Sequence, residues 1–171
     1  FGWHLPLLML FVSAMLVIIF IDIDFQIIPD VITLPGMPIG VLAAAFLLPD
    51  PFLTFHTSGG TAVFEIVGIV NSVIGLVVGF GLFYLIAVLS KGGMGGGDVK
   101  MMGMVGAFLG WKGVLLTTLL GSLTGAIVGV SLMALNKAGR KTKIPFGPYL
   151  ALGALISLFF GTPILRWYLG T

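Results

Sequence analysis

The sequence predicts an all-α integral membrane protein with about six transmembrane helices, forming a single domain over residues 1–171. Of the residues, 58% are hydrophobic and only 8% are charged, and the mean hydropathy is +1.21. A soluble domain carries about 25% charged residues. This chain cannot cover a globular surface with polar side chains, so lipid must cover it instead.

Six apolar segments account for the expected helices. A helix needs about 20 apolar residues to cross about 30 Å of hydrocarbon. The expected spans are residues 5–21, 31–48, 66–89, 99–111, 113–135 and 149–169. The fourth span would reach only about 20 Å at 1.5 Å per residue, so we expect its start to lie below the membrane surface or the helix to tilt. Because only Lys112 and Gly113 mark the boundary with the fifth span, these two spans should form a tight helical hairpin.

The basic residues predict the orientation in the membrane. With six alternating spans, the first, third and fifth connections lie on one side. That side carries Lys91, Lys100, Lys137, Arg140, Lys141 and Lys143, whereas the other carries Lys112 and Arg166. Because cytoplasmic loops are enriched in Lys and Arg, we expect these connections in the cytoplasm, both chain ends outside, and the protein in the cytoplasmic (inner) membrane.

Several functional classes are excluded or disfavoured by residues that the sequence lacks. With no cysteine, the chain cannot form a disulfide, a thiolate metal site or a cysteine nucleophile. Two isolated histidines, His4 and His56, make a metal site improbable, and no Gly-x-Ser-Gly sequence suggests a serine protease. A net charge of +2 is too small to argue for nucleic-acid binding.

Glycines recur at helical spacing within the third and fifth spans. They are Gly75 and Gly79, then Gly121, Gly125 and Gly129. Small residues four apart let helices approach closely in lipid, so these glycines are interpreted as helix-packing positions. The methionines at 101, 102 and 104 have the same interpretation.

The acidic residues fall into two groups at membrane ends. Asp22, Asp24 and Asp30 follow the first span, and Asp98 precedes the fourth, whereas Asp50 and Glu65 fall in an outer connection. A carboxylate at a helix centre costs about 2.5–3.5 kcal/mol in a membrane, and such residues are functional candidates. Helix capping is the alternative for the two aspartates that precede apolar helices, Asp30 and Asp98.

A glycine-rich segment leads into Asp98. Five of the six residues at 92–97 are glycine. Because glycine has no side chain to block the approach, another chain can come close to this backbone. It is not a nucleotide-binding P-loop, because no Gly-Lys-Ser/Thr follows. Next to an aspartate at a helix start, it suits a site where an extended substrate backbone passes a carboxylate.

Two aspartates from different helices at one membrane edge suit aspartic proteolysis. One carboxylate activates water as a base, and the other, protonated, donates to the scissile carbonyl, since close like charges cannot both ionise. No metal or cofactor is needed. The alternative is a proton- or cation-coupled transporter that uses Asp22 and Asp98, although the charges lie at one edge and the spans show no evident inverted repeat.

The two acidic groups resemble the motifs of the type IV prepilin peptidases, bacterial branch. Residues 22–30 are similar to the first aspartate motif of that family, and residues 95–100 to its Gly-x-Gly-Asp motif. Residues 107–111 and 144–149 are also similar to bacterial members. The resemblance implies that Asp22 and Asp98 are catalytic, with supporting roles for Asp24, Asp30, Gly95, Gly97 and Lys100.

The resemblance also implies a substrate. Enzymes of this family remove the basic leader of prepilins and pseudopilins, after a glycine, at the cytoplasmic membrane face. Full-length bacterial members carry further spans and a cytoplasmic domain with Cys-x-x-Cys pairs, so the chain resembles their C-terminal catalytic part or a shorter relative. Many members also methylate the new N-terminus with S-adenosylmethionine. We expect this chain alone to cleave and not to methylate, with its basic connection at 136–148 on anionic lipid headgroups.

Overall fold

The chain folds into a helical bundle with one small hairpin. The structure, a computed structural model, describes residues 4–52, 57–58, 61–62, 66–90, 93–135 and 145–169. In order, the elements are α1 (His4–Phe25), α2 (Asp30–Phe46), β1 (Thr57–Ser58), β2 (Thr61–Ala62), α3 (Gly68–Leu89), α4 (Gly96–Ala134) and α5 (Gly147–Leu169). The all-α prediction therefore holds except for the antiparallel two-residue strands, which the sequence analysis did not predict.

Four of these helices are long and apolar enough to cross a membrane. They are α1, α3, α4 and α5. Helix α2 has 17 residues and reaches about 26 Å at 1.5 Å per residue. The predicted multi-pass membrane class is thus supported by four long apolar helices and one shorter one.

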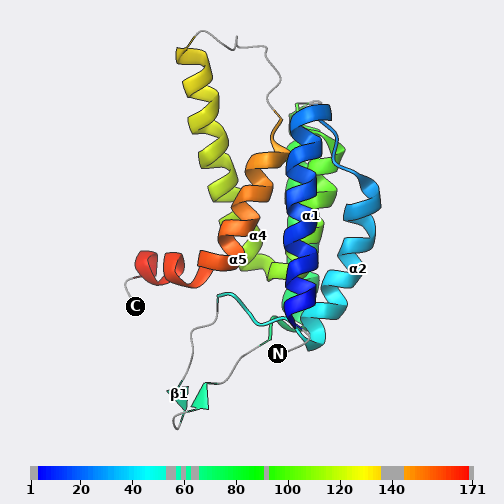
Figure 1. Ribbon diagram of the computed structural model, residues 1–171, viewed down its shortest axis with the longest axis vertical. Helices are drawn as coiled ribbons and strands as arrows, with labels where there is room; N and C mark the ends of the chain where they lie inside the picture. Colours follow the sequence, from blue (N-terminus) through cyan, green and yellow to red (C-terminus); the bar gives the residue numbers. More distant parts are fainter. Residues whose placement is uncertain are drawn as a thin grey trace.

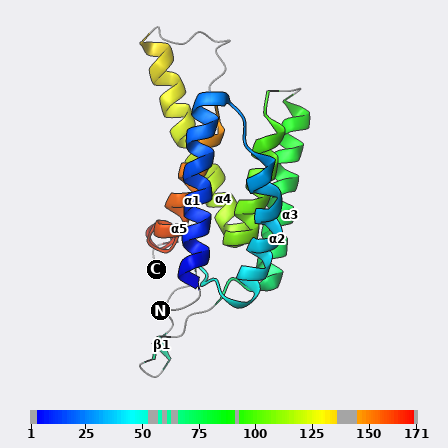
Figure 2. The same cartoon turned by 45° about the vertical axis from the view of Figure 1, so that its right-hand side comes forward.

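Helix α4 has 39 residues and is broken at Gly110, where φ is 70° and ψ is −179°. Side chains larger than hydrogen strongly disfavour this conformation. The part after the break runs back toward the end of the bundle where α4 began (Figures 1 and 2). The predicted helical hairpin is therefore present, but the prediction placed its turn at Lys112 and Gly113, two residues too late.

The part of α4 before the break forms the centre of the bundle. Its residues from Val99 to Gly110 are buried on nearly all sides apart from Lys100, as expected for a helix that is apolar all round. Helix α3 packs most extensively against α4, followed by α5 and α2. The three methionines at 101, 102 and 104 lie in this core, which confirms their predicted packing role.

Glycines let the helices meet along their backbones. A Cβ at Gly75 would collide with the carbonyl oxygen of Gly106, and a Cβ at Gly106 with that of Gly75. Gly79 lies in the same way against Met102 of α4, and Gly121 against Leu150 of α5. The predicted packing role is confirmed for Gly75, Gly79 and Gly121.

The helix ends that carry the candidate site residues lie at one end of the bundle. The end of α1, the start of α2, the start of α4 and the start of α5 all lie at the upper end in Figures 1 and 2, opposite the start of α1 and the β hairpin. Several residues used for the sequence predictions lie outside the described residues. They are His56, Glu65, Lys91, Gly92, Lys137, Arg140, Lys141, Lys143 and Ile144.

Candidate active site

Asp22 lies in the last turn of α1 and is buried, with 5% of its surface exposed. Its carbonyl oxygen accepts a hydrogen bond from the N–H of Gln26 over 3.0 Å. Gln26 has a φ of 54°, and the chain leaves the helix there. Asp24, two residues from Asp22 on the same helix, is exposed. One turn of helix therefore directs Asp22 into the protein and Asp24 out of it.

Asp98 lies in the first turn of α4 and is 7% exposed. The residue before the helix, Gly95, is extended, with φ −75° and ψ 145°, and its carbonyl accepts the N–H of Asp98 over 3.2 Å. Gly95 has no side chain to cap this helix start, but the Asp98 carboxylate accepts the backbone N–H of Gly95, so the capping alternative for Asp98 is confirmed in part. Within the described residues, Oδ1 of Asp98 is buried without a hydrogen-bond partner. Buried polar atoms are normally paired, so this atom is available for a ligand.

The two buried carboxylates lie near enough to one another for their charges to interact. Asp22 comes from the end of α1 and Asp98 from the start of α4, 76 positions apart in the sequence. The fold thus brings near one another the two aspartates that the sequence analysis named as a pair.

One apolar side chain near the aspartates contacts the starts of both α4 and α5. Ile28, in the connection between α1 and α2, is 8% exposed. A Cβ built on Gly97 would lie 2.7 Å from its Cβ, and one built on Gly147 would lie 3.0 Å from its Cδ1. Ile28 therefore joins the starts of α4 and α5, and the two glycines make room for it.

The start of α5 contacts Asp22 directly. The backbone N–H of Gly147, the first residue of α5, donates a hydrogen bond to the Asp22 carboxylate. The first N–H groups of a helix have no partner within the helix, and the helix dipole favours negative charge there. The carboxylate therefore pairs one of the N–H groups that the helix start leaves unpaired, and the helix dipole favours its negative charge.

Asp30 and Lys100 form an ion pair beside this site, with Nζ of Lys100 2.6 Å from Oδ2 of Asp30. Asp30 is the first residue of α2, and no side chain caps that helix. The capping alternative for Asp30 is therefore wrong, because its carboxylate instead binds a lysine on α4.

A comparison with protein-family models matches residues 9–130 to the type IV leader peptidase family. The matched stretch includes both buried aspartates and the glycine-rich segment between α3 and α4. The chain belongs to the type IV leader peptidase family.

Curated relatives carry the same family's names. A prepilin leader peptidase/N-methyltransferase of Pseudomonas aeruginosa is 40% identical over 99% of this chain and 54% of its own length. Proteins with the same name from Aeromonas salmonicida and Legionella pneumophila are 36% and 34% identical, each over 99% of this chain. The chain spans about half the length of these relatives. The search of solved structures found no match.

Seen as a member of the leader peptidase family, the chain brings most of its predicted site residues together. Asp22 and Asp98 are buried near one another. Gly95 and Gly97 precede Asp98, and Asp30 and Lys100 pair nearby, whereas Asp24 is exposed. The sequence analysis assigned no role to Ile28 or Gly147. The available signal was a glycine followed by proline at the start of an apolar helix, since proline is favoured in a helix's first turn.

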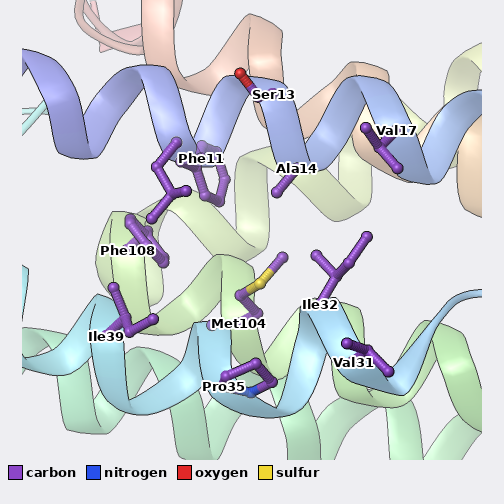
Figure 3. Close-up of a pocket in the computed structure, with 12 residues that line it drawn as sticks. Phe11, Ser13, Ala14, Val17, Val31, Ile32, Pro35, Ile39, Met104 and Phe108 are labelled. Carbon is purple, nitrogen blue, oxygen red and sulfur yellow. The ribbon is translucent and has the colours of Figure 1, made fainter.

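An apolar cavity elsewhere in the bundle is not lined by either aspartate. It has a volume of about 310 Å³ and lies between α1, α2 and α4. Figure 3 shows Met104 and Phe108 of α4 between the two other helices, with Val17 and Val31 at the end nearer the aspartates. The rings of Phe11 and Phe108, with centroids 4.7 Å apart, lie at the opposite end. This cavity is apolar and carries no acid–base group, so the candidate chemistry lies at the aspartates.

Proposed function

We propose that this chain is a membrane-embedded aspartic endopeptidase that removes the leader peptide of type IV prepilins or pseudopilins. The observation that supports it best is the burial of Asp22 and Asp98 near one another at one end of the bundle, within the stretch that matches the leader peptidase family. The relatives named above carry the name prepilin leader peptidase, and the chain spans about half of their length.

The proposed reaction uses both carboxylates and one water. One carboxylate takes a proton from water as the oxygen attacks the scissile carbonyl carbon, and the other, protonated, donates its proton to the carbonyl oxygen. The tetrahedral intermediate then collapses, the C–N bond breaks, and the leaving nitrogen takes a proton from the pair. Close like charges favour a single shared proton in the resting pair, and the reaction needs no metal or other cofactor.

The proposed location is the cytoplasmic edge of the inner membrane, with six membrane crossings. Helices α1, α2, α3 and α5 would each cross once, and the two parts of α4 would each cross once. The part of α4 from Gly96 to Gly110 spans only about 22 Å at 1.5 Å per residue, so Asp98 would lie below the membrane surface. The basic residues of the sequence support placing this end in the cytoplasm.

Substitution of each aspartate tests the proposal, with a matched control on the same helix. Asp22→Asn and Asp98→Asn should each lower cleavage of a prepilin-like substrate by at least about 100-fold, the usual contribution of a general acid or base. Asp24→Asn, whose side chain is exposed, should retain most of the activity. Membrane insertion and melting temperature in detergent serve as folding controls.

Near-normal turnover by a folded Asp22→Asn or Asp98→Asn variant would disprove the assignment. Ion flux through liposomes that contain the chain, without cleavage of the substrate, would instead favour a transporter. The proposal covers proteolysis only. Methyl transfer, the second activity in the relatives' names, is not assigned to this chain, because its longest predicted cytoplasmic connection is the 13-residue stretch 136–148.

A further inference from the structure

The Asp22 carboxylate is held at the start of α5 by the backbone of Gly147. The Gly147 N–H donates to this carboxylate, and Gly147 is the first residue of its helix. A backbone donor on a packed helix has a fixed position, unlike a donor on a flexible side chain. The orientation of Asp22 therefore depends on where α5 begins.

The absence of a side chain at position 147 is required by Asp22. A Cβ built there would collide with Oδ2 of Asp22 and lie 3.0 Å from its Cγ. The other close atom is Cδ1 of Ile28, also at 3.0 Å. The backbone of Gly147 does not have a positive φ, so an alanine would be unstrained in its own conformation. Its cost would come from displacing the Asp22 carboxylate.

The two aspartates are held differently. Asp22 accepts a backbone hydrogen bond from the start of another helix, whereas Asp98 accepts one from Gly95 at the start of its own helix, and its Oδ1 has no partner among the described residues. We propose that Gly147 is a positioning residue, which orients the Asp22 carboxylate toward Asp98 through its N–H and through the space that its missing side chain leaves. This inference rests on the proposed peptidase function, and it assigns to α5 a part in the site.

Kinetics of Gly147→Ala distinguish positioning from binding and folding. We expect a fall in kcat of at least tenfold with KM within about twofold of wild type, because the substrate still binds but one carboxylate is misplaced. Gly81→Ala is the matched control, since a Cβ at Gly81 has nothing within 4 Å; it should keep wild-type kinetics. A rise in KM with kcat unchanged, or wild-type kinetics for Gly147→Ala, would overturn the proposal.

A second substitution separates the two collisions of the new methyl group. Ile28→Val removes Cδ1, the atom of Ile28 that the methyl would meet, and leaves Asp22 in place. If displacement of Asp22 causes the loss, Gly147→Ala should lower kcat by the same factor in the Ile28→Val background as in the wild-type background. Recovery of kcat in the double variant would assign the loss to packing against Ile28 and overturn the proposal.

A measurement on the unsubstituted residue covers the case in which Gly147→Ala fails to fold. The chain has four Phe–Gly pairs, at 1–2, 80–81, 146–147 and 160–161. Labelling with carbonyl-¹³C phenylalanine and ¹⁵N glycine therefore selects four amide signals in NMR. One of the four, the amide of Gly147, should change its proton chemical shift clearly in Asp22→Asn, because an amide oxygen is a weaker hydrogen-bond acceptor than a carboxylate oxygen. No change in any of the four would overturn the hydrogen bond, and this readout does not depend on peptidase activity.

Discussion

Oδ2 of Asp30 lies 2.6 Å from Nζ of Lys100, and this ion pair joins the first residue of α2 to α4, two residues after Asp98. Helices α1 and α2 barely contact one another, whereas α2 packs well against α4. The pair therefore fixes the start of α2 on the helix that carries Asp98. Both side chains are partly exposed, at 51% for Asp30 and 34% for Lys100.

We expect this ion pair to contribute little to stability. Exposed pairs contribute about 0–1 kcal/mol, so Asp30→Asn and Lys100→Met should each change the free energy of unfolding by about 1 kcal/mol or less. Cleavage should fall by no more than several-fold, far less than for Asp98→Asn. A double-mutant cycle on melting and on kcat checks this. If Asp30→Asn lowered the cleavage rate as much as Asp98→Asn does, Asp30 would have to take part in the reaction itself.

Adjacent glycines at the start of α4 give a matched pair of substitutions. A Cβ at Gly97 would lie 2.7 Å from the Cβ of Ile28, whereas a Cβ at Gly96 would have nothing within 4 Å. Gly97→Ala should destabilise the protein by about 1–3 kcal/mol, as overpacking commonly does, and lower cleavage because Asp98 is the next residue. Gly96→Ala should do neither. Equal effects of the two substitutions on melting temperature would contradict the contact with Ile28.

The sequence predicted the positions of the two buried aspartates better than it predicted the contacts of the residues around them. Asp22 and Asp98 could be proposed as a pair because each lies at the edge of an apolar helix and because the family resemblance singled them out. The predicted cap at Asp30 failed because its true partner, Lys100, is 70 positions away, and local pattern says nothing of such a contact. Ile28 and Gly147 were missed for the same reason, since their contacts join three separate segments.

The fold shows the same division between local and long-range information. Apolar runs located the helices to within a few residues, because lipid requires long apolar segments. The break at Gly110 was placed two residues too late, since the sequence has 26 glycines and does not reveal which one adopts a positive φ. The orientation remains a prediction, because most of its basic residues lie outside the described residues.

The proposed dyad should work without a metal. Two carboxylates and water complete the reaction, so cleavage should be unchanged by a divalent-metal chelator and by serine-directed inhibitors. Among the described residues, no three His, Cys, Asp or Glu side chains are grouped as metal ligands. The assay compares initial rates before and after chelation. Loss of activity that zinc or magnesium then restores would contradict the dyad mechanism.

The orientation can be measured with single cysteines, because the chain has none of its own. Gly93→Cys lies in the connection between α3 and α4, and Ser58→Cys lies in β1 at the other end of the bundle. In whole cells, an impermeant thiol reagent should label the cysteine at 58 and not the one at 93, because cytoplasmic loops carry the excess of Lys and Arg. Both should react after the membrane is permeabilised. Labelling at 93 from outside would reverse the orientation and place the aspartates on the outer side.

The close contact between α3 and α4 predicts a sharp difference between two glycines on one helix. At Gly75 a Cβ would meet the backbone of Gly106 and Gly110, which cannot move aside as a flexible side chain can. Gly75→Ala should therefore force α3 away from the helix that carries Asp98 and lower the free energy of unfolding by at least about 1–3 kcal/mol. Gly81→Ala, on the same helix with open space around it, should cause no loss. Thermal melting in detergent measures both variants. Cleavage should fall in Gly75→Ala, more than 20 positions from either aspartate in sequence, and a stable, fully active Gly75→Ala would show that α3 does not hold α4 in place.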